Sequence, residues 1–277
     1  MSAKEHLQQA IAKLQAADCE SARLDAEYLL MHAWGINRTQ LIIKAHDDLP
    51  SDVAHIFSEY IVRRCKREPV AYIIGEKEFW SRSFNVSPDV LIPRPETEHL
   101  IEELLKLYPD TQAPYYFADI GTGSGCIAIT IACEYPNAIV LATDISEKSL
   151  IIARSNAEKH VVSERVQFKQ GDLYQAFDAN TQAFDAILSN PPYVSVDEMH
   201  GLEQELHHEP AHALTDKNDG LSLLRVLLNE APNHLKQGGY ILVETGLCGL
   251  PKTPDAITML YPYDDLAGNL RGGAYQY

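Results

Sequence analysis

From residue 115 onward, short apolar runs alternate with segments of helical period, and this alternation constrains the fold of the 277-residue chain more than any other feature. The apolar runs predict buried strands, and the longer periodic segments predict helices. Strands separated by helices pair in parallel, because each crossover returns the chain to the same end of the sheet. We therefore expect an α/β domain with a mostly parallel sheet covered by helices on both faces. The expected strands are Tyr116–Ile120, Ala138–Thr143, Val166–Lys169, Phe184–Leu188 and Tyr240–Glu244, and the expected helices are Cys126–Glu134, Glu147–His160 and Leu221–Asn233.

The chain before this region has a different character. Apolar residues recur at three- and four-residue spacing over residues 7–14 and 53–61, which predicts helices. Between residues 76 and 92, aromatic and branched residues lie among Ser, Asn, Pro and Asp, a pattern typical of a β-hairpin or an extended connector. We expect a helical domain over residues 1–75, a β-hairpin linker over 76–95 and the α/β domain over 96–277.

Charge and cysteine content argue against several classes of protein. The formal net charge of −16, almost all of it on residues 76–277, argues against a generic nucleic-acid binder, because phosphate neutralisation needs clustered Lys and Arg. Five sparse cysteines without a C-x-x-C pair exclude a disulfide scaffold and a zinc ribbon, and they suit a reduced cytoplasm. No apolar run approaches the ~18 residues of a membrane helix, and the polar N-terminus does not resemble a signal peptide.

A glycine-rich turn follows the first expected strand, in the sequence Asp119-Ile-Gly-Thr-Gly-Ser-Gly125. Glycines at such a turn let the backbone bend sharply and let a ligand approach main-chain N–H groups. Asp144 comes 19 residues after Gly125, at the end of the second strand, where a carboxylate can accept both hydroxyls of an adenosine ribose. The dinucleotide pattern G-x-G-x-x-G fails at Cys126. Together, the glycine-rich turn and Asp144 predict a nucleoside cofactor, but they do not specify which nucleoside compound it is.

Two further strand ends carry polar residues. Asp172 follows the third strand, where its carboxylate could accept a hydrogen bond from an adenine amine while Leu173 packs on the ring; a helix N-cap explains Asp172 equally well. Ser189-Asn190-Pro191-Pro192-Tyr193 follows the fourth strand. Its prolines have no N–H, so this loop offers mainly acceptors, namely the Asn190 side-chain oxygen and the carbonyls of Asn190 and Pro191. Such a loop suits a planar –NH2 group.

These motifs together resemble class I S-adenosylmethionine methyltransferases that act on a planar nitrogen. The segments LIPRPETE (91–98) and EFW (78–80) and the helical N-terminal part narrow the resemblance to the peptide chain release factor N5-glutamine methyltransferases, the HemK-type family, over roughly residues 5–246. The resemblance implies a Rossmann-like fold, S-adenosyl-L-methionine as cofactor and methylation of the glutamine in the Gly-Gly-Gln motif of bacterial release factors. Independently of the resemblance, the cysteine content predicts a cytoplasmic protein, and the charge and the lack of a membrane-length apolar run predict neither a direct nucleic-acid partner nor a membrane.

The resemblance also implies a role for each motif residue. Tyr193 is expected against the plane of the substrate amide. Independently of the resemblance, the spacing of His200, His207, His208 and His212 matches no metal-site signature, so they are expected to be solvated loop residues and no metal is expected. The implied cofactor-binding residues are Gly121, Thr122, Gly123, Ser124 and Gly125 for the methionine and ribose parts, Asp144 for the ribose hydroxyls, Asp172 and Leu173 for the adenine, and Asn190 at the cofactor border; the implied catalytic and substrate-binding residues are Asn190, Pro191, Pro192 and Tyr193.

The C-terminal part departs from the family pattern. A closing D-x-x-G-x-x-R, here residues 265–271, arrives early after Gly246, so the last helix and the edge strands need not form. The dense basic run at residues 63–67 has two interpretations, charges that suit a helix C-terminus or a patch that docks the release factor on the helical domain. Three other functions stay open: a glutamine methyltransferase of a large-subunit ribosomal protein, an adenine-N6 nucleic-acid methyltransferase and a non-catalytic nucleoside-binding module.

Overall fold

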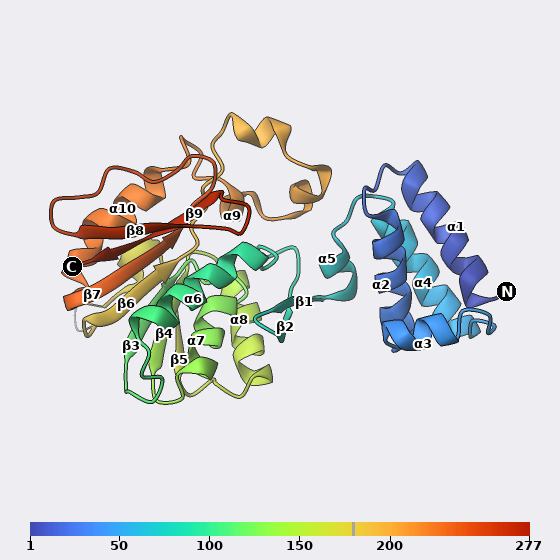
Figure 1. Cartoon of the computed structure of the whole chain (residues 1–277), viewed down its shortest axis with the longest axis horizontal. Coiled ribbons are helices and arrows are strands. Elements are labelled where there is room, and N and C mark those ends of the chain that lie inside the picture. The colour runs from blue at the N-terminus through green and yellow to red at the C-terminus, as the bar shows by residue number, and fades with distance from the viewer. Residues whose placement is uncertain (179–180) are drawn as a thin grey trace. The chain divides into compact units, whose positions relative to one another are not determined.

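A seven-stranded sheet in the order β5-β4-β3-β6-β7-β9-β8 forms the centre of the C-terminal part (Figure 1). Its first five strands along the chain pair in parallel, whereas β9 runs antiparallel to both β7 and β8. The strand order reverses between β3 and β6, and a crevice opens at such a point. The strands are β3 (Tyr116–Ile120), β4 (Ile139–Asp144), β5 (Val166–Gln170), β6 (Phe184–Ser189), β7 (Leu235–Glu244), β8 (Thr258–Asp264) and β9 (Leu270–Gln276).

Helices cover both faces of this sheet, which confirms the expected α/β class. Successive strand residues point to opposite faces: Phe117 packs in one apolar core with α6 and α7, whereas Ala118 packs in another with α10. The helices of this part are α6 (Glu98–Leu107), α7 (Cys126–Glu134), α8 (Glu147–Lys159), the short α9 (Ala211–Leu214) and α10 (Ser222–Glu230), with single 3₁₀ turns at Pro95–Thr97, Leu173–Ala176, Glu198–Gly201, Gln204–His208 and Ala231–Asn233.

The structure is a computed structural model that describes residues 1–178 and 181–277, and these residues form two compact units. The larger unit comprises residues 77–202 and 209–277, and the smaller comprises residues 1–76 and 203–208. Among the described residues, no helix combines the length and the apolar character that a membrane span requires.

A β-hairpin precedes the large sheet in the chain. β1 (Glu76–Phe79) and β2 (Arg82–Asn85) form a two-stranded sheet within the segment where the sequence predicts a hairpin. Phe79 and Phe84 are fully buried in the same core as α6 and α7. The backbone N–H of Asn85 donates to Asn156 Oδ1 at 2.7 Å, and Asn156 Nδ2 donates back to the Asn85 carbonyl at 3.0 Å. The second strand of the hairpin is therefore part of the larger unit.

The smaller unit packs five helices around an apolar core. This core includes the fully buried Leu14, Leu29 and Leu30 together with Phe57. This helical content agrees with the periodicity of the first 75 residues. The helices are α1 (Ala3–Ala16), α2 (Ala22–Trp34), α3 (Arg38–Ile43), α4 (Ser51–Arg64) and α5 (Val70–Ile74).

The basic run at the end of α4 is held within the smaller unit. Arg63 pairs with Glu68, and Arg64, only 5% exposed, donates to Asp25 Oδ2 at 2.7 Å. Arg63 and Arg64 therefore have partners within the protein, and docking of the release factor by this run stays a prediction. Buried guanidinium groups need partners, and the fold supplies carboxylates for them.

Glu205 supplies the remaining partner, from a segment far along the chain. Its carboxylate accepts hydrogen bonds from Arg64 at 2.8 Å and from Arg67 at 2.8 and 2.7 Å. Burial by itself would raise the pKa of Glu205, but the hydrogen bonds from Arg67 and Arg64 outweigh burial and lower the pKa to about 2. Residues 203–208 therefore belong to the smaller unit, although the residues before and after them belong to the larger unit.

The C-terminal edge strands form although the segment before them is short. Residues 245–257, all described, contain no helix, whereas β8 and β9 pair as a hairpin. The turn is closed by Asp265, whose Oδ1 accepts from the backbone N–H groups of Ala267 and Asn269 and whose Oδ2 accepts from Arg271 Nε. The expectation that the edge strands need not form is therefore wrong, because this turn supplies its own hydrogen bonds.

Candidate active site

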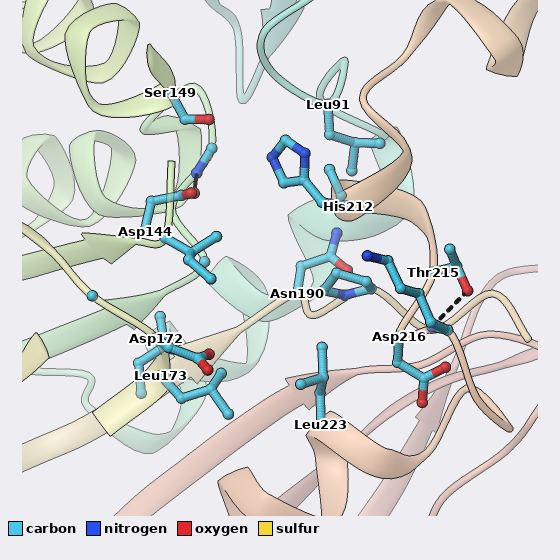
Figure 2. A pocket seen from close by; sticks show the side chains of 18 residues that line it. Leu91, Asp144, Ser149, Asp172, Leu173, Asn190, His212, Thr215, Asp216 and Leu223 are labelled. Atoms are coloured by element: carbon cyan, nitrogen blue, oxygen red, sulfur yellow. Dashed lines mark hydrogen bonds between the residues drawn. The ribbon is translucent and has the colours of Figure 1, made fainter. Parts of the chain in front are cut away.

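A cavity of about 400 Å³ opens at the carboxyl ends of the central strands (Figure 2). It lies where the strand order reverses between β3 and β6, the usual ligand position in an open α/β sheet. All of its lining residues belong to the larger unit. Of the residues assigned a role from the sequence, seven line it: Gly121, Gly123, Asp144, Asp172, Leu173, Asn190 and Pro192.

The glycine-rich loop after β3 forms one wall. The backbone N–H groups of Gly121 and Thr122 donate to the Thr143 carbonyl at 2.9 and 2.8 Å, which folds the loop over the end of β4. Gly125 begins α7 with a φ of +83°, and a Cβ there would lie 2.8 Å from Ile129 Cδ1. Thr122, Ser124 and Gly125 do not line the cavity. These three residues shape the loop, whereas Gly121 and Gly123 line the cavity.

Asp144 connects this loop to the next strand end. Its Oδ2 accepts from the Gly123 N–H at 2.9 Å, and its Oδ1 accepts from the Ser146 N–H at 2.8 Å. Burial raises the pKa of this carboxyl, and the two hydrogen bonds act in the opposite direction. A carboxylate offers about four acceptor positions, so each oxygen can still accept a hydroxyl. Figure 2 shows Asp144 at the cavity wall across from Asn190.

Asp119 is a further acidic residue of this region that the sequence reasoning did not assign. It is fully buried, and its Oδ2 accepts from Thr122 Oγ1 at 2.6 Å and from the Ala128 N–H at 3.1 Å. Burial raises its pKa to about 7. The side chain ties the glycine-rich loop to the first turn of α7. Its position as the first residue of the glycine motif was the available signal.

Asp172 and Leu173 form the wall beyond β5. Asp172 directly precedes a 3₁₀ turn (Leu173–Ala176), but its side chain makes no capping hydrogen bond. The carboxylate is exposed and lines the cavity next to Leu173 (Figure 2). The cavity interpretation of Asp172 therefore has more support than the helix N-cap interpretation.

Asn190 lies directly after β6 with its amide held in one orientation. Its Nδ2 donates to Thr97 Oγ1 at 3.0 Å, and Thr97 is only 2% exposed. Within residues 1–178 and 181–277, no hydrogen bond to Asn190 Oδ1 is present. The amide therefore has its donor side engaged and its acceptor side available. Pro192 lines the cavity beside it, whereas Pro191 is buried.

Tyr193 is held by Glu244, at the end of β7. It is not among the residues that line the cavity, and its hydroxyl donates to Glu244 Oε1 at 3.2 Å. The ring packs closely on Gly246, where a Cβ would lie 2.6 Å from Tyr193 Cδ2. Burial raises the pKa of the phenol above its ordinary range, so Tyr193 stays a hydrogen-bond donor. Contact between Tyr193 and a substrate amide stays a prediction.

The segment 212–217 supplies cavity residues that the sequence reasoning missed. His212, expected as a solvated loop residue, is exposed but directed into the cavity (Figure 2). Asp216 accepts hydrogen bonds from the backbone N–H groups of Asn218, Gly220 and Ser222, which closes the following turn. No sequence periodicity marks this segment, because only its first three residues are helical, at the end of the four-residue α9.

Glu209 holds the start of this segment against the region before α6. Its Oε2 accepts from the Ile92 N–H at 3.1 Å, and its Oε1 accepts from Arg94 Nη2 at 2.5 Å. Glu209 is 6% exposed, so the pair is largely removed from water. The IPRP segment and the loop after Tyr193 therefore meet at one wall of the site.

The charge of the cavity favours a cationic ligand. Three carboxylates line it, from Asp144, Asp172 and Asp216, against one lysine, Lys217. In the part of the chain that the structure describes, no group of three or more His, Cys, Asp or Glu residues is placed to hold a metal ion.

Comparisons with known proteins identify matching families and relatives. The PrmC N-terminal domain family matches residues 5–75, and the Methyltransferase small domain family matches residues 97–220. A release factor glutamine methyltransferase of Koribacter versatilis (strain Ellin345) is 42% identical over 247 residues, which cover 89% of this chain and 87% of the relative. Relatives of the same name from Neisseria gonorrhoeae and Nitratidesulfovibrio vulgaris are 41% and 38% identical, covering 81% and 94% of this chain and 80% and 86% of the relatives.

Solved structures share the fold at low sequence identity. The hMettl16 catalytic domain in complex with MAT2A 3′UTR hairpin 1 superposes with a TM-score of 0.57 and 14% identity, covering 91% of this chain and 90% of that chain. The same domain in complex with hairpin 6 gives a TM-score of 0.55 and 15% identity, with 81% of each chain covered. At such identity the similarity concerns the arrangement of helices and strands alone.

Proposed function

The chain belongs to the release factor glutamine methyltransferase family, and on that premise we propose that it methylates the side-chain amide nitrogen, N5, of the glutamine in the Gly-Gly-Gln motif of peptide chain release factors. The larger unit has the class I methyltransferase fold. The observation that carries the proposal is Asn190, whose amide nitrogen is engaged by Thr97 while its oxygen is available at the cavity.

S-adenosyl-L-methionine is the cofactor that we propose for the cavity. Asp144 would accept the ribose hydroxyls on the lone pairs that Gly123 and Ser146 leave unused. Gly121 and Gly123 would lie beside the methionine part, and Asp172 and Leu173 beside the adenine. The acidic lining suits a sulfonium cation. When bound, this cofactor supplies a methyl group that its positive sulfur activates.

The residues around Asn190 would make the glutamine nitrogen reactive. An amide nitrogen is a weak nucleophile because its lone pair is shared with the carbonyl. Acceptors at Asn190 Oδ1 and the Pro191 carbonyl would hold both N–H groups and stabilise the positive charge that develops on nitrogen. Such orientation can lower the barrier by about 7–11 kcal/mol. The nitrogen would form a bond to the methyl carbon as the bond from that carbon to the sulfonium sulfur breaks, leaving a neutral thioether, and would then release one proton to water, so no general base is needed.

The same arrangement favours glutamine over glutamate. A glutamate carboxylate has no N–H to donate and would meet only acceptors in this loop. We propose that the helical domain, residues 1–75, binds the body of the release factor, since one loop-tip glutamine offers little surface for recognition. The five cysteines are free in the structure, in agreement with the cytoplasmic location that we propose.

The test is methyl transfer from tritiated S-adenosylmethionine. Purified release factor should be labelled, and a variant with the Gly-Gly-Gln glutamine replaced by alanine should not. Large-subunit ribosomal proteins and adenine-containing oligonucleotides are the comparison substrates. Stronger labelling of either comparison substrate than of release factor would overturn the proposal. Retained labelling of the alanine variant would show that another residue is the acceptor.

A further inference from the structure

Four side chains from three separate segments meet behind the cavity. Thr97 lies just before α6, Asn190 and Tyr193 follow β6, and Glu244 ends β7. Asn190 Nδ2 donates to Thr97 Oγ1 at 3.0 Å, and the Tyr193 hydroxyl donates to Glu244 Oε1 at 3.2 Å. Thr97 and Glu244 are each 2% exposed, so water does not compete for these hydrogen bonds. The group is therefore a small buried polar network.

Hydrogen-bond direction in this network follows from proton counting. A threonine hydroxyl has one proton and accepts at its oxygen. Since Thr97 Oγ1 accepts from Asn190, its own proton stays free for another acceptor, and the Thr97 hydroxyl lowers the pKa of the buried Glu244 carboxyl. An ionised carboxylate can only accept. Glu244 Oε2 is buried and has no hydrogen-bond partner among the described residues.

We propose that Thr97 is a positioning residue that keeps the Asn190 amide oxygen directed to the substrate. Glu244 accepts from the Tyr193 hydroxyl and so holds the loop that carries Asn190. This inference rests on the proposed function and deepens it, because the orientation of one amide then selects a substrate –NH2 group. A flipped Asn190 would present its own –NH2 group, and the site would lose an acceptor.

The charge of Glu244 also bears on this network. Burial and the nearby Glu96 disfavour its charge, whereas the Thr97 and Tyr193 hydroxyls and Arg271 favour it, and the result is a pKa of about 7. Tyr263 and Cys126 also face it, and burial keeps both neutral by raising their pKa values. A protonated Glu244 could donate to Thr97 and compete with Asn190 for the hydroxyl oxygen. We therefore expect kcat to fall as the pH decreases through about 7.

Matched variants of Thr97 test the inference. Thr97→Val keeps the shape but removes the acceptor, so kcat on release factor should fall by about 10-fold or more, since a buried donor loses its partner. Thr97→Ser keeps the hydroxyl and should stay within about twofold of wild type. The Kd of S-adenosylmethionine should be unchanged in both. Glu244→Gln should lower kcat and abolish its decrease near pH 7.

A second set of variants, made in an Asn190→Asp background, separates the effect of Thr97 on the orientation of the Asn190 amide from its effect on packing. In Asn190→Asp both terminal atoms are acceptors, so orientation by Thr97 no longer matters. Adding Thr97→Val should then change the residual rate by less than about threefold, well below its effect with Asn190 present. An equal loss in both backgrounds, or a wild-type kcat for Thr97→Val, would overturn the inference.

A measurement without turnover keeps this inference separate from the proposed function. The side-chain amide protons of Asn190, followed by NMR, should exchange slowly with solvent in wild type and in Thr97→Ser, and faster in Thr97→Val. Equal exchange in all three proteins would overturn the network. If wild type fails to methylate release factor while the exchange pattern holds, the proposed substrate is wrong and the network is retained.

Discussion

Replacement of Asp144 by asparagine should weaken cofactor binding more than any other single change in the cavity wall. The two carboxylate oxygens accept one main-chain N–H each, from Gly123 at 2.9 Å and from Ser146 at 2.8 Å, and the side chain faces the cavity. In Asp144→Asn one oxygen becomes an –NH2 group. One main-chain N–H then loses its acceptor. A ribose hydroxyl loses a charged acceptor, because the carboxylate has become a neutral amide.

The magnitude follows from these losses. A charge-assisted hydrogen bond contributes about 1.5–3 kcal/mol, so the Kd of S-adenosylmethionine should rise by about 10- to 150-fold. The unpaired N–H should also lower the free energy of unfolding by about 1–3 kcal/mol. For a unit of this size each kcal/mol lowers the Tm by about 2–4 °C.

Isothermal titration calorimetry with the cofactor measures the first effect, and thermal unfolding measures the second. Asp172→Asn is the matched control, because Asp172 is exposed and its side chain makes no capping bond. It should raise the Kd by less than about 10-fold and leave the Tm unchanged. An unchanged Kd in Asp144→Asn together with a lower turnover would refute the ribose assignment.

Three further results are expected. Asn190→Ala should reduce kcat by about 100-fold or more with little change in cofactor Kd, as measured by single-turnover labelling and calorimetry, because one transition-state acceptor is lost; an unchanged kcat would contradict its role. Glu205→Ala should lower the free energy of unfolding by about 1–3 kcal/mol relative to the exposed control Glu203→Ala, because buried Arg64 loses a partner. In the folded protein the pKa of Glu205 is lowered from 4.5 to about 2. The loss of unfolding free energy in Glu205→Ala should therefore be largest above about pH 4.5 and shrink as the pH falls toward 2. A loss that does not depend on pH would contradict the pairing. Lys66→Glu should raise the KM for intact release factor at low salt but not the KM for a short Gly-Gly-Gln peptide, whereas equal changes on both substrates would exclude a docking role for this side chain.

Local patterns in the sequence were sufficient for most elements of the larger unit. Tyr116–Ile120 and Cys126–Glu134 form a strand and a helix with the bounds that the pattern predicts. The reason is physical, since the period of apolar residues reports which face of an element is buried. The glycine loop, Asp144, Asp172 and Asn190 also meet as expected, because parallel strands bring their carboxyl ends to one edge of the sheet.

Other features depend on partners that are distant in the sequence. Thr97 and Asn190 are 93 residues apart, and Arg64 and Glu205 are 141 residues apart, so no local pattern could pair them. An open patch was one interpretation of the basic run for this reason, and Tyr193 was expected at the substrate although its hydroxyl donates to Glu244. The sequence by itself determined which segments become strands and helices and which motifs lie at the strand ends. Only the tertiary structure decided which polar groups are buried together, and therefore which way their hydrogen bonds point, because burial and proton donation depend on neighbours that folding alone brings into contact.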